Sequence, residues 1–125
     1  MKKILVLITL ILMLPFATAR LSSDNIQINR IRFGDYGYVR GPDMNSYIHV
    51  YNNNDCCDMD DTSISFRILD TDVFDSEAGL RIKDGEGYGK SFMTPVDGLH
   101  GEYLVRVTVS SGGVRRVKHR YVFID

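Results

Sequence analysis

Two adjacent cysteines, Cys56 and Cys57, are the only thiol-bearing residues of the chain. They could remain free thiols, form a disulfide with each other, or bridge to another molecule. Adjacent cysteines cannot staple distant segments of one chain, and a bond between neighbours is strained and more readily reduced. We therefore expect free or incidentally oxidised thiols, with a redox or assembly role as the alternative.

The loop around these cysteines also carries the densest group of carboxylates, Asp55, Asp58, Asp60 and Asp61. Calcium takes six to eight oxygen ligands, and an acidic loop beside asparagines could supply several. The spacing lacks the glycine that makes the sharp turn of a calcium loop and the glutamate that closes it. We expect a solvated loop with no cofactor, and keep calcium as the alternative.

Catalytic motifs are missing from the sequence. The three histidines, His49, His100 and His119, lie on separate segments without the paired spacing of a zinc site. There is no Gly-x-Ser-x-Gly elbow, and the two cysteines lie among acids, without the positive surroundings that activate a thiolate. We predict that the protein is not an enzyme.

Two surfaces are candidates for binding. Alternation places Arg116, Lys118 and Arg120 on one side of the last apolar run, where they could meet an acidic partner or an anionic envelope polymer. Charges on a sheet edge also prevent pairing with neighbouring strands, which is the simpler interpretation. The second candidate surface carries four tyrosines, because aromatic side chains beside a polar loop often contact sugars or proteins. They are Tyr36, Tyr38, Tyr47 and Tyr51.

The element that must organise these residues is a hairpin over residues 101–124, two alternating runs joined by a Ser-Ser-Gly-Gly turn. The period of two predicts one buried face for each run. The residues expected on the buried faces are Tyr103, Val105, Val107, Val117, Tyr121 and Phe123. Such a hairpin needs a second layer to cover its apolar face.

Shorter alternating runs upstream supply that layer. Ile26 and Ile28 are in step, whereas Ile31 and Phe33 are offset by one, which predicts a bulge or a change of sheet. Further runs over residues 44–52 and 62–69 alternate in the same way. With turn signals every 8 to 12 residues and no helical period, the pattern predicts an all-β antiparallel sandwich of about seven strands.

The first 19 residues have the pattern of a signal peptide. Lys2 and Lys3 precede an apolar run, and Ala17, Thr18 and Ala19 resemble a cleavage site. We expect cleavage after Ala19, which would leave one domain over residues 20–125, secreted or at the cell surface. A retained membrane anchor is the alternative, although the run is short for a spanning helix. The net charge of −1 argues against a nucleic-acid partner.

The segment VRGPDMNSYIHVYNNND resembles the opening of the immunoglobulin-like cell-adhesion-related domains of bacteria and archaea, and GEYLVRVTV resembles their penultimate strand. This resemblance covers most of residues 30–124. It implies an immunoglobulin-like sandwich that acts as an exported, non-catalytic binding or adhesion module for a protein or glycan of the cell envelope. The alternative is a structural subunit that associates with copies of itself through the basic strand, the acidic loops or the cysteines.

Overall fold

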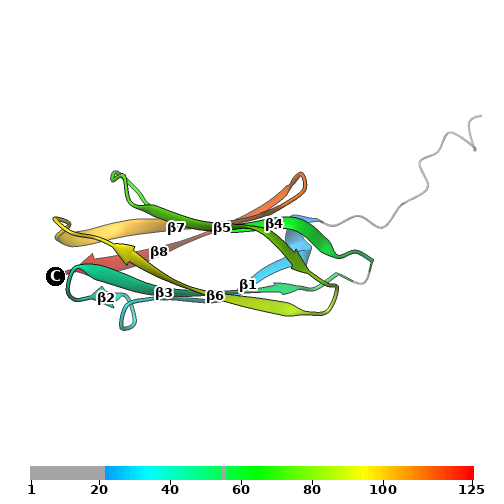
Figure 1. The fold of residues 1–125 in the computed structure, drawn as a ribbon, viewed down its shortest axis with the longest axis horizontal. Helices are drawn as coiled ribbons and strands as arrows, with labels where there is room; N and C mark the ends of the chain where they lie inside the picture. The colour runs from blue at the N-terminus through cyan, green and yellow to red at the C-terminus, as the bar shows by residue number, and fades with distance from the viewer. Residues whose placement is uncertain (1–21, 55) are drawn as a thin grey trace, which may run out of the picture.

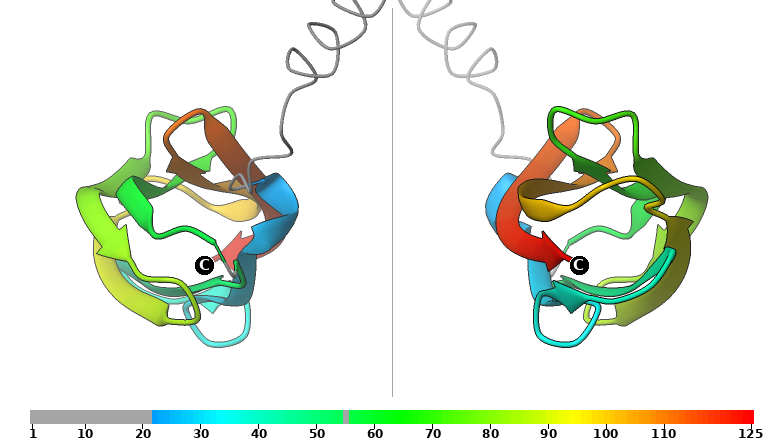
Figure 2. Two further views of the ribbon diagram at one scale, coloured as in Figure 1. Left: turned by 90° about the vertical axis from the view of Figure 1, so that its right-hand side faces the viewer. Right: turned by 90° about the vertical axis from the view of Figure 1, so that its left-hand side faces the viewer.

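The computed structural model describes residues 22–54 and 56–125, which form two packed β-sheets after one short 3-10 turn, Ser23–Asn25. The strands are β1 (Ile26–Phe33), β2 (Tyr38–Val39), β3 (Asp43–Asn52), β4 (Met59–Ile68), β5 (Phe74–Ile82), β6 (Gly87–Pro95), β7 (Gly101–Ser111) and β8 (Val114–Ile124). Figure 1 shows the sheets as two layers along the long axis, and Figure 2 shows how they curve toward each other. The all-β sandwich predicted from the sequence is confirmed.

The strand order is that of an immunoglobulin-like domain. One sheet has the order β1-β3-β6 and the other β2-β8-β7-β4-β5. All pairs are antiparallel except β2 with β8, where Tyr38 lies opposite Phe123 and Val39 opposite Ile124. In immunoglobulin lettering, β1, β3 and β6 take the places of strands A, B and E, and β4, β7 and β8 those of C, F and G.

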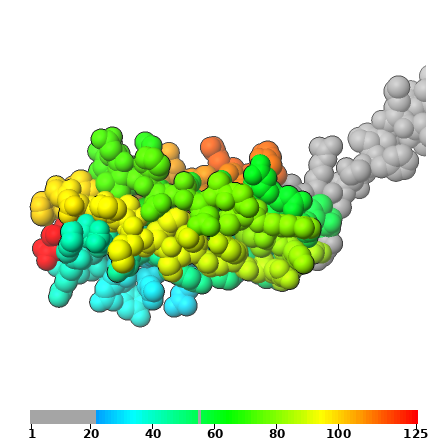
Figure 3. Space-filling view, in the orientation of Figure 1, coloured from blue at the N-terminus to red at the C-terminus, as the bar shows by residue number. Residues whose placement is uncertain are grey.

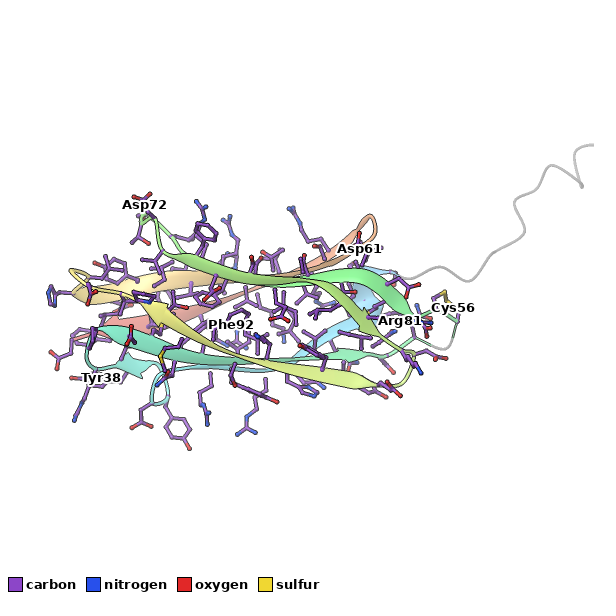
Figure 4. The ribbon with its side chains drawn as sticks, viewed as in Figure 1. Tyr38, Cys56, Asp61, Asp72, Arg81 and Phe92 are labelled. Atoms are coloured by element: carbon purple, nitrogen blue, oxygen red, sulfur yellow. A yellow bond between two sulfur atoms is a disulfide. The ribbon has the colours of Figure 1, made fainter. Side chains whose placement is uncertain are left out.

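The alternation of β3, β4 and β7 produces the core. Every second side chain of these strands is buried, and Phe66 of β4 lies at the centre. Its ring makes edge contacts with Phe33 at 5.4 Å and Phe92 at 5.3 Å between centroids, so β1, β4 and β6 meet there (Figure 4). Val105 and Val107 are buried as predicted.

The predicted face of β8 is wrong. Val117, Tyr121 and Phe123 are exposed, and the buried side chains of this strand are Val122 and Ile124. The first part of β8 runs beside the edge of β1, where inward-facing charged side chains still reach water and backbone carbonyls. Phe123 instead stacks outside the core on Tyr38, with 5.7 Å between ring centroids. Alternation alone therefore did not reveal which face of this strand is buried.

The predicted bulge in the first strand is confirmed, since the pairing of β1 with β3 shifts between Ile28 and Arg30. β6 contains two glycines, Gly87 and Gly89, within its first three residues. Tyr47 and His49 of β3 lie across these two glycines, in the space that a Cβ atom would need.

The two open sides of the sandwich are closed differently. Between β5 and β6, Lys90 donates to Glu77 at 2.6 Å and Thr94 donates to Asp75 at 2.9 Å. The carboxylate of Glu77 raises the pKa of Lys90. Figure 3 shows atoms of β5 and β6 meeting in a continuous surface on this side. The other side, between β1 and β8, carries the candidate site.

The expected signal peptide, residues 1–19, lies outside the described residues. Within the part that the structure describes, no helix is long and apolar enough to cross a membrane.

Candidate binding groove

The basic residues of β8 do not act as one stripe. Arg116 donates to the carbonyl oxygen of Ser23 at 3.2 Å, and its guanidinium lies 3.6 Å from Asp24. Lys118 donates to the carbonyl oxygen of Ile28 at 3.0 Å. These two side chains therefore join the sheets along the edge of β1. Arg120 differs, because it is exposed and, among the described residues, donates only to the carbonyl oxygen of its neighbour His119, at 2.8 Å.

Arg120 lies in an open groove of about 270 Å³ between β1 and β8. The lining residues are Arg30, Ile31, Arg32, Phe33, Tyr36, Gly37, Arg120 and Tyr121. The strand β1 contributes two arginines, the turn before β2 contributes Tyr36, and β8 contributes Arg120 and Tyr121. We call this hollow the arginine-tyrosine groove. None of its lining residues, all within the described part of the chain, is a carboxylate.

A tight turn presents Tyr36 to solvent. Asp35 and Tyr38 exchange backbone hydrogen bonds of 2.8 and 3.0 Å, and the Gly37 amide donates to Phe33 at 2.8 Å. The turn is fixed to β8 because Phe123 donates to the Gly37 carbonyl at 2.8 Å. Tyr36 has a φ of 51°, a left-handed conformation that is unfavourable for an aromatic residue, and its side chain is 95% exposed. The fold thus holds a large ring in water at the rim of the groove.

Charge and aromatic surface are combined in the groove. Its three arginines form no ion pair with any carboxylate among the described residues, and Tyr121 is 68% exposed. A guanidinium presents a planar set of donors that fits a carboxylate, sulfate or phosphate. An exposed tyrosine ring offers a flat apolar face with a polar tip. The groove can therefore hold an anionic group beside a flat apolar one.

Of the second predicted surface, Tyr36 lines the groove and Tyr38 does not. Tyr47 and Tyr51 are also outside the lining, although Tyr47 lies opposite the lining residue Arg32. Tyr47 and Tyr51 belong to β3, the central strand of the three-stranded sheet, and point away from the core. Both are half-buried, and Tyr47 lies over Gly89. The structure thus assigns Tyr47 a packing contact and does not bring it together with Arg120.

The prediction of free thiols is wrong, because Cys56 and Cys57 form a disulfide with each other. The loop that holds them is anchored by Asn52, whose buried side-chain amide donates to the Cys57 carbonyl at 2.9 Å and to the Ile82 carbonyl at 3.1 Å. Asn52 thus links the backbone at Cys57 to the end of β5. Figure 4 shows Cys56 and Tyr38 at opposite ends of the sandwich, so the disulfide is remote from the turn that holds Tyr36.

Two carboxylates of the acidic cluster, Asp58 and Asp60, share one arginine, Arg81. Arg81 donates to Asp58 at 2.8 Å and lies 3.1 Å from Asp60. This hydrogen bond, together with one from the Asp84 amide at 3.0 Å, lowers the pKa of Asp58. Asp55 lies outside the described residues, and those described contain no group of three or more candidate metal ligands. The carboxylates proposed for calcium therefore have a protein partner in at least two cases.

Sequence reasoning named Arg120 and Tyr36 on separate surfaces but missed Arg30 and Arg32 and the groove that joins them. Arg30 and Arg32 sit two residues apart on the strand with the phase change, and Tyr36 lies within a glycine-rich connector. The available signal was the bulge itself, because a bulged edge strand often redirects side chains toward a site. Only the pairing of the two sheets shows that this edge lies beside Arg120.

Comparison with known proteins supports the fold. No family model matches the chain, so membership of the cell-adhesion-related family stays a prediction. No curated protein matches it either. Among solved structures, the crystal structure of the C-terminal domain of wzt is similar, with a TM-score of 0.60 and 17% identity over 81% of this chain and 74% of that domain. At this identity the likeness concerns the sandwich fold alone.

Proposed function

We propose that the protein is an exported, non-catalytic binding module whose ligand is a negatively charged protein or glycan of the cell envelope. The arginine-tyrosine groove is the proposed binding site. Export rests on the expected signal peptide, and the immunoglobulin-like sandwich supplies a rigid frame on which loops and strand edges present side chains.

The observation that carries this proposal is Tyr36. A non-glycine residue with φ of 51° costs conformational free energy, and a fully exposed ring recovers none of it through packing. Strained residues of this kind cluster at ligand-binding and active sites. Tyr36 stands beside three arginines that lack carboxylate partners among the described residues, so an anion with a flat neighbouring group fits the site.

The alternative of self-association has less support. Cys56 and Cys57 are bonded to each other, which leaves no thiol for a link between copies. Arg116 and Lys118 are engaged within the chain, and Asp58 and Asp60 are engaged by Arg81. A second copy would therefore have to displace contacts that already exist.

Affinity electrophoresis tests the binding function. The native protein would be run through gels that contain polygalacturonate, polyglutamate or neutral dextran. We expect retardation in at least one of the two anionic gels and none in dextran. The double variant Arg30→Ala/Arg120→Ala should lose that retardation, while the charge-matched control Lys83→Ala/Arg115→Ala should keep at least half of it. Equal retardation of both double variants, or no retardation of the wild type, would contradict the proposal.

A further inference from the structure

The outer face of the five-stranded sheet carries a second basic site. Three register pairs align Phe74 of β5, Arg67 of β4, Arg106 of β7 and His119 of β8 in one row across the sheet. All four side chains are exposed. Arg67 and Arg106 thus lie directly opposite each other on neighbouring strands.

Two like charges directly opposite each other destabilise a sheet. Neither arginine forms an ion pair with a carboxylate in the described part of the chain. Their other contacts orient them instead. The Arg67 guanidinium lies 5.5 Å from the centroid of the Phe74 ring, and Arg106 donates from Nε to His119 Nε2 at 3.3 Å. The remaining donors of both guanidinium groups are available for an anion.

A hollow of about 340 Å³ lies beside this pair. Its lining residues are Ser65, Phe66, Arg67, Phe74, Ser76, Arg106 and Thr108, which include three hydroxyl groups and no carboxylate within the described residues. Asp70 and Asp72 line a separate hollow on the other side of the two arginines. An anion is therefore favoured on the side of Ser65 and Thr108, away from the acidic β4–β5 turn.

The second site is connected to the arginine-tyrosine groove along β8. His119 ends the arginine row, and Tyr121, two residues further on the same face, lines the groove. From Phe74 on β5 to His119 on β8 the row crosses three strand spacings, roughly 14 Å, and Tyr121 lies two residues further along β8. A ligand that covers the whole row and the groove must therefore be extended, and a single sugar or a free anion is too short.

Resting on the proposed function, we propose that the ligand is an acidic polysaccharide, which runs from the groove across β8 to the Arg67 and Arg106 pair. The two sites offer the groups that such a chain needs. Guanidinium groups bind its carboxylates, the exposed rings of Tyr36, Tyr121 and Phe74 pack against the apolar faces of sugar rings, and Ser65, Ser76 and Thr108 exchange hydrogen bonds with its hydroxyls.

Titration calorimetry with galacturonate oligomers of defined length tests this assignment. We expect a long oligomer of about ten sugars to bind at least tenfold more tightly than a trimer, because it engages both sites. Arg67→Ala/Arg106→Ala should weaken binding of the long oligomer about tenfold and leave the trimer unchanged. Lys83→Ala/Arg115→Ala, which also removes two charges, should leave the ratio of the two affinities unchanged. Melting temperatures of all variants would show whether each is folded.

The outcomes separate the two proposals. If the long oligomer binds the wild type and Arg67→Ala/Arg106→Ala equally, the second site is wrong and the groove remains. If the trimer binds as tightly as the long oligomer, the extended ligand is wrong. If polyglutamate of similar length binds more tightly than the oligomer, the occupant is an acidic polypeptide and the polysaccharide is wrong. If neither polymer binds the wild type, the proposed function itself fails.

Discussion

Lys118 of β8 donates a hydrogen bond to the carbonyl oxygen of Ile28 on β1, across the open side of the sandwich, at 3.0 Å. Ile28 immediately precedes the bulge, and β1 is the edge strand of its sheet. Without a partner, this carbonyl would be left beside the core where water reaches it poorly. Lys118 therefore ties the edge of one sheet to the other, next to the arginine-tyrosine groove.

Lys118→Met should destabilise the fold, because it keeps most of the side-chain volume and removes the donor. We expect a loss of about 1 to 2 kcal/mol in the free energy of unfolding, measured by urea denaturation. Arg115→Met on the same strand is the control, since Arg115 is exposed, and its effect should stay within about 0.5 kcal/mol. Equal effects of the two substitutions would show that the bond to Ile28 contributes nothing.

The strands with one clearly buried face could be predicted from the sequence. The alternation over β3, β4 and β7 is strong, because these strands are interior to their sheets and every second side chain enters the core. The bulge in β1 could also be predicted, because the apolar residues of this strand change phase between Ile28 and Ile31. These features depend on local pattern, and local pattern is what a single sequence contains.

The face of β8 and the groove depend on which strands meet, and that relation is not local. Arg116 and Lys118 face inward because β1 supplies carbonyl partners there, so charge at these positions did not mark the solvent side. Asn52 reaches the Cys57 carbonyl from the end of β3, a contact that no local pattern of the sequence indicates. The site residues Arg30, Arg32 and Tyr36 come together with Arg120 only when the two sheets pack.

Gly89 and Tyr47 should show strong energetic coupling. A Cβ at residue 89 would occupy the space of the Tyr47 ring, so Gly89→Ala should cost about 1 kcal/mol in the wild type. In a Tyr47→Ala background the same substitution should stabilise the protein, because alanine loses less backbone entropy in a strand. A double-mutant cycle measures this coupling. Additive effects would mean that Tyr47 does not lie over Gly89 in solution.

The ion pair between Asp58 and Arg81 should contribute to the acid sensitivity of the fold. Because the pKa of Asp58 is lowered in the folded protein, its contribution to stability is present above the unfolded pKa of about 3.9 and is lost as the pH falls through the lower folded value. The melting temperature of the wild type should therefore fall more steeply than that of Asp58→Asn between about pH 4 and pH 2. Parallel curves would contradict this role.

The disulfide should be internal and contribute little to global stability. Reduction should add the mass of two hydrogens to the intact chain. Without reductant, the protein should already run as a monomer on a denaturing gel. Because the bond joins adjacent residues, it closes almost no loop, and Cys56→Ser/Cys57→Ser should change the free energy of unfolding by less than about 1 kcal/mol. A dimer that reductant converts to a monomer would show that the cysteines link two copies of the chain. A large loss of stability would show that the loop depends on the bond.

The most direct test of the binding site is to map amide chemical shifts of the isotope-labelled protein during titration with a galacturonate trimer. The largest changes should fall on Tyr36, Gly37, Arg120 and Tyr121, around the arginine-tyrosine groove, and should saturate together with one affinity. Changes centred on Tyr51, or on the Cys56–Cys57 loop, would place the site on another surface and contradict the account. The absence of any change on addition of the trimer would contradict the polysaccharide assignment.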